Sequence, residues 1–137
     1  MLLTKKTEYA LLSLISIAKS QHPKNVDELS RELNIPKPYL AKILQSFSKN
    51  EILNSFKGAN GGFTLKVDPA KLSILKISSI SEDRKPAVFE CSTSQDSCPS
   101  QKASQCNLWP VLNNLQHKID DFLDSLTLKD IIYTDTF

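Results

Sequence analysis

The sequence predicts a mainly α-helical fold with one small β-hairpin, in which an N-terminal helical part is followed by a long C-terminal helix. Three observations predict it. Apolar residues recur at helical spacing along most of the 137 residues. A Gly-rich turn is flanked by two short segments in which apolar and polar residues alternate. Near the C-terminus, apolar residues repeat at spacings of four and three. The length fits one domain, or one small domain with a dimerisation element.

The charge is unevenly distributed along the chain. Residues 1–66 contain ten Lys and Arg against five Asp and Glu, whereas residues 67–137 contain seven against ten. A basic N-terminal half is typical of proteins that bind a phosphate backbone. The apolar stretch at residues 9–18 is too short to span a bilayer, and Lys19 stands where an export signal would have small residues. We therefore expect a cytoplasmic protein that makes no membrane contact.

Two helices are expected at the start of the chain. The first runs from Lys5 to Lys19 and is apolar nearly all round, which predicts burial on more than one side. The second begins at Asn25, which can cap it, with Glu28 reaching back as in a capping box. Its expected inner face is Val26, Leu29 and Leu33.

The third helix opens at Pro38, because proline fits the first turn of a helix. Its core face is Leu40, Ile43, Leu44 and Phe47, and its outer face carries Lys37, Tyr39, Lys42 and Gln45. Two short helices joined by a tight turn, the second with basic and amide groups outward, are typical of a helix-turn-helix, although any helical hairpin shares the pattern. We expect these four outer residues to contact bases or phosphates of DNA.

A β-hairpin is expected directly after the third helix, around the flexible turn at residues 58–62. The expected strands are 52–57 and 63–67. A hairpin in this place is a wing, so residues 1–83 are predicted to form a winged helix-turn-helix domain. Lys57 and the bare backbone of Gly61 and Gly62 are expected to contact the DNA backbone. The alternative role of the hairpin is to close the small core.

A short helix over residues 72–82 leads into a polar loop, 84–107, that contains all three cysteines of the chain: Cys91, Cys98 and Cys106. Ser, Gln, Asp and Pro surround them, so they cannot act as small hydrophobic core residues. They are therefore metal or cluster ligands, or redox thiols. Structural zinc is a further alternative, but its cysteines are usually separated by two to four residues, and here six and seven intervene. An enzyme is disfavoured, since neither histidine has a nucleophile partner and no phosphate-binding Gly loop precedes a helix.

Residues 108–137 are predicted to form a dimerisation helix and a C-terminal tail. The apolar residues of this helix are Leu108, Leu112, Leu115, Ile119, Phe122 and Leu126, separated by 4, 3, 4, 3 and 4 positions. This spacing favours pairing with a second copy of the chain, and the alternative is packing within one chain. Thr127 and Asp130 are expected to cap a short last helix.

The sequence resembles the Rrf-two family of bacterial winged-helix transcription regulators (IscR/NsrR-type) over nearly its whole length. The segments that carry the resemblance are residues 3–11, 39–44, 55–65 and 122–128, together with Trp109. Arg is common in the family where Lys57 stands here. The resemblance implies a homodimeric regulator, expected to be a repressor, that binds a double-stranded DNA operator.

The resemblance also implies that Cys91, Cys98 and Cys106 hold a [2Fe–2S] or [4Fe–4S] iron–sulfur cluster, which would sense nitric oxide, redox or iron–sulfur status. In the IscR type a His follows the third cysteine closely, but here the residues after Cys106 are Asn107, Leu108 and Trp109. In the NsrR type a carboxylate near the N-terminus of the partner subunit completes the ligand set, and Glu8 stands at that position. A carboxylate there also suits the dipole of the first helix. Some relatives are instead cluster-free thiol/disulfide switches, which remains the alternative.

Overall fold

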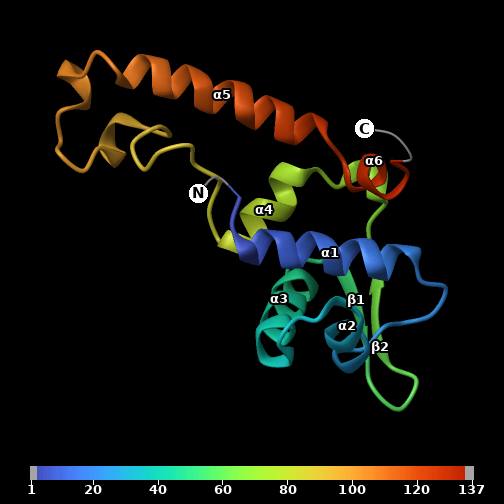
Figure 1. Cartoon of the computed structure of the whole chain (residues 1–137). Helices are drawn as coiled ribbons and strands as arrows, with labels where there is room; N and C mark the ends of the chain where they lie inside the picture. The colour runs from blue at the N-terminus through green and yellow to red at the C-terminus, as the bar shows by residue number, and fades with distance from the viewer. Residues whose placement is uncertain (1–2, 135–137) are drawn as a thin grey trace.

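The computed structural model of the protein describes residues 3–134, so the first two residues of the predicted N-terminal domain and the last three of the tail lie outside the described residues. The elements in chain order are α1 (Lys5–Lys19), α2 (Val26–Leu33), α3 (Lys37–Lys49), β1 (Leu53–Phe56), β2 (Gly62–Leu65), α4 (Ile74–Glu82), α5 (Trp109–Ser125) and α6 (Leu128–Ile132), with short 3-10 turns η1 (Pro69–Lys71), η2 (Gln95–Ser97) and η3 (Ala103–Gln105). A mainly helical chain with one two-stranded antiparallel hairpin confirms the predicted fold class (Figure 1).

Local capping explains where the first helices begin. Thr4 caps α1 through a hydrogen bond from the Thr7 backbone N–H, and α1 has the predicted bounds. Asn25 caps α2, since its side-chain oxygen accepts from the Glu28 backbone N–H at 2.8 Å. Glu28 does reach back, but its carboxylate accepts from the Asn25 side-chain amide at 3.3 Å. The start of α2 was therefore predicted correctly, through a pair of side chains that differs in detail from a capping box.

Helix α1 lies at the centre of the molecule (Figure 1). It packs against α4 and α6, and also against α2, α3 and β2, which confirms burial on more than one side. Its residues in the core are Ala10, Leu14 and Ile17. The four apolar residues predicted for the inner face of α3 are all buried. The winged domain thus has a continuous apolar core beneath α3.

The hairpin is attached to the rest of the winged domain at the start of β2. Strands β1 and β2 pair in register from Leu53↔Leu65 to Phe56↔Gly62, so the turn comprises residues 57–61. The start of β2 is joined to the segment before α2, because the Phe63 N–H donates to the Lys24 carbonyl at 2.8 Å and the Lys24 N–H donates back at 3.2 Å. As Figure 1 shows, α3 and the hairpin tip lie on the same side of α1, and α5 lies on the other.

The C-terminal helices are anchored to the winged domain by backbone hydrogen bonds. The Ile74 N–H donates to the Leu126 carbonyl at 2.8 Å, and the Leu128 N–H donates to the Leu72 carbonyl at 2.9 Å. Helix α4 begins two residues later than predicted because Ser73 caps it, accepting from the Lys76 N–H. Thr127 and Asp130 form the predicted capping box of α6. The C-terminal end of α5 is therefore fixed in place.

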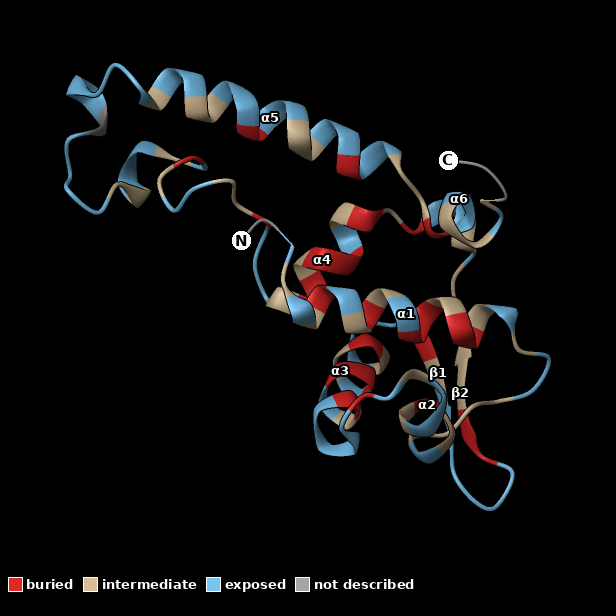
Figure 2. Cartoon of the chain, in the orientation of Figure 1, coloured by how far each residue is buried: buried red, intermediate tan, exposed pale blue. Residues whose placement is uncertain are grey.

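Helix α5 is largely exposed along its length (Figure 2). Its predicted apolar spacing divides between two faces. Ile119 and Leu126 pack partly against the core of the chain. Three other predicted residues, Leu108, Leu115 and Phe122, face solvent with exposed fractions of 59, 42 and 62 %. Together with Val111, which the predicted spacing did not include and which is 63 % exposed, they are here called the α5 stripe. An apolar stripe of this kind on a small domain marks an interaction surface.

Candidate functional site

The outer face of α3 presents the side chains that the sequence singled out. Lys37, Lys42 and Gln45 are exposed. Tyr39 is partly covered, because its ring meets the ring of Tyr9 on α1 edge to face, with centroids 5.6 Å apart and planes at 87°. Such an arrangement is favourable for aromatic pairs. The contact orients the first turn of α3 from the central helix, so the surface is polar, basic and rigidly supported.

One cation of this face is partnered within the chain. The Lys37 ammonium lies 2.6 Å from a carboxylate oxygen of Asp27, in the first turn of α2. The hydrogen bond from Lys37, together with its charge, lowers the pKa of Asp27 below its usual range. The carboxylate is therefore charged throughout the neutral pH range, and any phosphate that approaches Lys37 must compete with it.

Replacing Asp27 with Asn should strengthen DNA binding. An exposed ion pair has a small net free energy, so freeing Lys37 should raise the affinity for DNA about two- to fivefold at low salt. The slope of log K for DNA binding against log salt concentration should also become steeper, by the amount expected for about one additional phosphate contact. Fluorescence anisotropy titrations at several salt concentrations measure both quantities.

The matched control for this experiment is Glu51→Gln. Glu51 pairs with Lys66 in another exposed ion pair, beyond the C-terminal end of α3 and at the end of the hairpin away from its turn. The control should leave the salt dependence unchanged. If Asp27→Asn bound DNA no more tightly than wild type, Lys37 would not be a phosphate contact.

In the wing, the predicted DNA contacts occupy different environments. Lys57 is exposed, together with Gly58 to Asn60, whereas Gly61 and Gly62 are buried. A Cβ atom on Gly61 would lie 2.3 Å from the Phe56 carbonyl oxygen. The geometry therefore gives the two buried glycines a part in folding the wing, and their contact with DNA stays a prediction.

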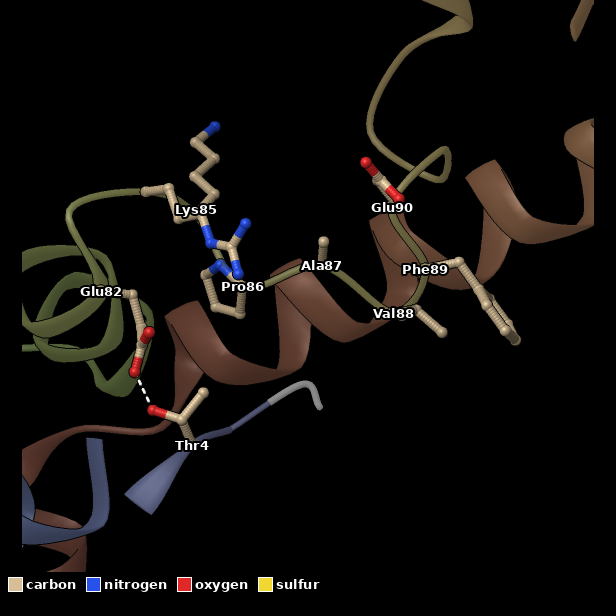
Figure 3. A pocket seen from close by; sticks show the side chains of 9 residues that line it. Thr4, Glu82, Lys85, Pro86, Ala87, Val88, Phe89 and Glu90 are labelled. Atoms are coloured by element: carbon tan, nitrogen blue, oxygen red, sulfur yellow. Dashed lines mark hydrogen bonds between the residues drawn. The ribbon is translucent and has the colours of Figure 1, made fainter. Parts of the chain in front are cut away.

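The loop 84–107 starts beside the N-terminus of α1. The Glu82 carboxylate, at the end of α4, accepts hydrogen bonds from the hydroxyls of Thr4 and Thr7. A cavity of about 490 Å³ lies there, lined by Thr4, Glu82 and residues 84–90 (Figure 3). The bond from Thr4 to Glu82 crosses one wall of it. This end of the loop is thus tied to the central helix.

The three cysteines are not drawn together. Cys91 and Cys98 are half-buried and Cys106 is exposed. Within residues 3–134, no three His, Cys, Asp or Glu side chains are grouped closely enough to hold a metal ion. Glu8 lies on the exposed side of α1, where it pairs with Lys5 at 2.9 Å. The thiols suit iron or zinc chemically, but the described arrangement of the loop is not a formed metal site.

Three residues that the sequence did not single out as functional tie the loop to α5. Trp109 donates from its indole N–H to the Cys91 carbonyl, and Asn113 donates from its amide to the Ser92 carbonyl, each at 2.9 Å. Gln116 is 2 % exposed and hydrogen-bonds to residues 86–92. The sequence offers one signal that Gln116 is buried, since it lies one helical turn from both Leu112 and Ile119. Its partners in the loop could not be predicted, because they lie 24–30 positions away.

Comparison with known proteins agrees with this architecture. Residues 3–134 match the model of the Rrf2 family, described as iron-dependent transcriptional regulators. The transcriptional regulator NsrR of Bacillus licheniformis is 30 % identical over 134 residues, covering 96 % of this chain and 92 % of the relative. The regulator IscR of Vibrio cholerae is 25 % identical, covering 96 % and 75 %. The structure of CymR, the global cysteine regulator of Bacillus subtilis, superposes with a TM-score of 0.73 at 24 % identity, covering 97 % and 98 %.

No described helix, within residues 3–134, is long and apolar enough to cross a membrane.

Proposed function

The chain belongs to the Rrf2 family of DNA-binding transcriptional regulators, and from that premise we propose that it is a homodimeric repressor whose operator affinity is set by its cysteine loop, through an iron–sulfur cluster. The observation that carries the DNA-binding part is the face of α3, which presents Lys37, Lys42, Tyr39 and Gln45 beside the wing. A helix of this kind enters the major groove, while a wing contacts the adjacent backbone.

A second copy of the chain is the proposed partner of the α5 stripe. Dimers of helix-turn-helix proteins bind two half-sites about one helical turn apart, so a symmetric pair of recognition helices requires a two-fold interface. The stripe offers this interface on the side of the molecule away from α3. An interface there leaves both recognition helices free to reach DNA.

The loop is the proposed sensor because it places three thiols in polar surroundings between the winged domain and α5. Iron–sulfur clusters are held by cysteine thiolates, and Cys91, Cys98 and Cys106 would supply three ligands. Glu8 of the partner subunit is the proposed fourth. Since the described loop does not bring the thiols together, cluster assembly would require the segment after Ser92 to fold back towards Cys91.

Anaerobic purification tests the cluster. The expected result is a coloured protein that contains iron and acid-labile sulfide, with an operator affinity that changes when the cluster is removed. A colourless protein without iron or sulfide, whose operator affinity is unaffected by reconstitution, would exclude the cluster. The same assay after diamide and then dithiothreitol would identify a thiol/disulfide switch, since that switch needs no iron.

Single cysteine substitutions should separate the two kinds of sensor. If the thiols hold a cluster, each of Cys91→Ser, Cys98→Ser and Cys106→Ser should lose iron and should fix the operator affinity at the value of the cluster-free protein. A disulfide switch uses two thiols, so one of the three variants would remain fully switchable. The matched control is Ser104→Ala, at an exposed position of the same loop, which should leave both properties unchanged.

A further inference from the structure

One buried amide connects the cysteine loop to the dimerisation helix. The Gln116 side-chain oxygen accepts from the Val88 N–H at 2.8 Å and from the Ser92 hydroxyl at 2.6 Å. Its NH₂ group donates to the Pro86 carbonyl at 2.8 Å and to the Asp120 carboxylate at 2.9 Å. A glutamine amide has two donor hydrogens and two acceptor lone pairs, so all of its hydrogen-bonding capacity is used.

Three of the four partners of Gln116 lie on a short segment, here called the arm, residues 86–92, which contains Cys91. Ser92 is fully buried, and its single hydroxyl hydrogen is shared between the Gln116 side-chain oxygen and the Phe89 carbonyl oxygen, which lies 2.8 Å from the hydroxyl. Trp109 and Asn113 extend the same contact to the carbonyls of Cys91 and Ser92. We call Trp109, Asn113 and Gln116 the α5 clamp. They lie about one helical turn apart and face the arm together.

The segment after the arm is organised differently. Hydrogen bonds there join near neighbours, as in the Cys98 N–H to the Gln95 carbonyl at 3.2 Å and the Gln101 N–H to the Cys98 carbonyl at 3.1 Å. Cys91 thus sits on backbone attached to α5, while Cys98 and Cys106 lie on a segment built from local turns. A change that draws these thiols towards Cys91 pulls on the arm, and the arm is attached to the middle of α5.

We infer that Gln116 is the positioning residue that transmits the state of the cysteine loop to the dimerisation helix. The inference rests on the proposed function, since it requires that the state of the loop changes DNA binding. Helix α5 is held at its C-terminal end by the Ile74–Leu126 and Leu72–Leu128 hydrogen bonds, so a pull on its middle would turn or tilt it about that end. A turn or tilt of α5 would change how the two α5 helices of the proposed dimer meet, so one polar contact would influence the positions of both recognition helices.

Alkylation of the cysteines tests the clamp in metal-free, reduced protein. Gln116→Leu keeps roughly the size of the side chain but removes the hydrogen bonds of Gln116 to Pro86, Val88 and Ser92. Cys91 should then react with iodoacetamide at least about tenfold faster, because three of the hydrogen bonds that hold the arm around it are lost. Cys106, which is already exposed, should keep its rate and serves as an internal control. Mass spectrometry of the modified peptides gives both rates.

The second readout is the ratio of operator affinities between the metal-free reduced protein and protein reconstituted with ferrous iron and sulfide. In Gln116→Leu this ratio should fall towards one while the variant still binds the operator, because the arm loses its buried attachment to the middle of α5. Asn114→Leu, at an exposed amide of the same helix, should keep the wild-type ratio. A residue with a merely structural role would lower the melting temperature of the variant and leave the ratio intact.

The outcomes separate this inference from the proposed function. A wild-type ratio of one, after both reconstitution and diamide oxidation, would remove the proposed regulation and the inference with it. A wild-type ratio above one that Gln116→Leu preserves would overturn the inference alone. If Gln116→Leu fails to fold, Trp109→Phe removes the indole N–H bond to the Cys91 carbonyl and keeps an aromatic ring at this position. That variant should accelerate Cys91 alkylation and reduce the ratio, and an unchanged rate and ratio would count against the clamp.

Discussion

Replacing Leu115 with Asp is expected to split the proposed dimer and to reduce operator affinity by at least about a hundredfold. Leu115 lies in the middle of the α5 stripe, between Val111 and Phe122. In a two-fold interface the substitution occurs in both copies, so it places two carboxylates against apolar surface. Burying an unpaired charge costs several kcal/mol. A monomer then presents one recognition helix where the operator offers two half-sites, so most of the binding free energy of the second half-site is lost.

Light scattering coupled to size-exclusion chromatography measures the split, and a gel-shift titration measures the affinity. The matched control is His117→Asp, which introduces the same carboxylate at an exposed position of α5 two residues further on and outside the stripe. This control should remain dimeric and bind the operator as wild type does. A Leu115→Asp protein that stays dimeric would show that the second copy docks elsewhere and that the stripe has another partner.

The helices were predictable because their signals are local. The bounds of α1 follow from an apolar run between Thr4 and Lys19, and the start of α2 follows from Asn25. The inward face of α3 follows from spacing alone, since Leu40 and Phe47 belong to a pattern that only a helix brings to one side. In each case the information lies within a few residues of the element that it specifies.

The loop was predictable only in composition. Its polarity and its cysteines predicted that it carries no apolar core, but nothing near Gln116 indicates that an amide of α5 reaches Pro86, 30 positions earlier. The apolar spacing of α5 likewise did not show which of its apolar residues face the core and which face solvent. Ile119 packs inward and Phe122 outward, because the position of α4 decides which face is covered. Contacts between distant segments depend on tertiary packing, which a local pattern does not encode.

The role of the wing glycines also depends on a contact between distant segments, which the local sequence does not show. The sequence suggested that Gly61 and Gly62 leave room for DNA, whereas the structure shows what they leave room for within the chain. At Gly62 a Cβ atom would lie 2.5 Å from the Lys24 carbonyl carbon and 2.6 Å from its oxygen. Lys24 is 38 positions earlier in the chain. The requirement for glycine arises from this backbone contact and would hold even without DNA.

Gly62→Ala should therefore destabilise the winged domain strongly. Gly62 has a φ of +145°, which an L side chain rarely adopts, and its Cβ would meet backbone that cannot rotate away. Backbone strain of about 1–3 kcal/mol and overpacking of about 1–3 kcal/mol together should lower the free energy of unfolding by about 2–6 kcal/mol. The melting temperature should fall by about 10 °C or more at fixed protein concentration.

Gly58→Ala separates the two causes of this loss. Gly58 also has a positive φ, +101°, but a Cβ atom there would meet nothing within 4 Å. In this variant only the backbone strain should act, so its free energy of unfolding should fall by about 1–3 kcal/mol. The difference between the two variants then measures the contact of the wing with Lys24. Since that contact pairs Phe63 with Lys24, Gly62→Ala should also displace the wing and weaken operator binding at temperatures where it is still folded. Equal melting temperatures for the two variants would mean that the wing can move off Lys24 at no cost, and the wing would then not be fixed relative to α2.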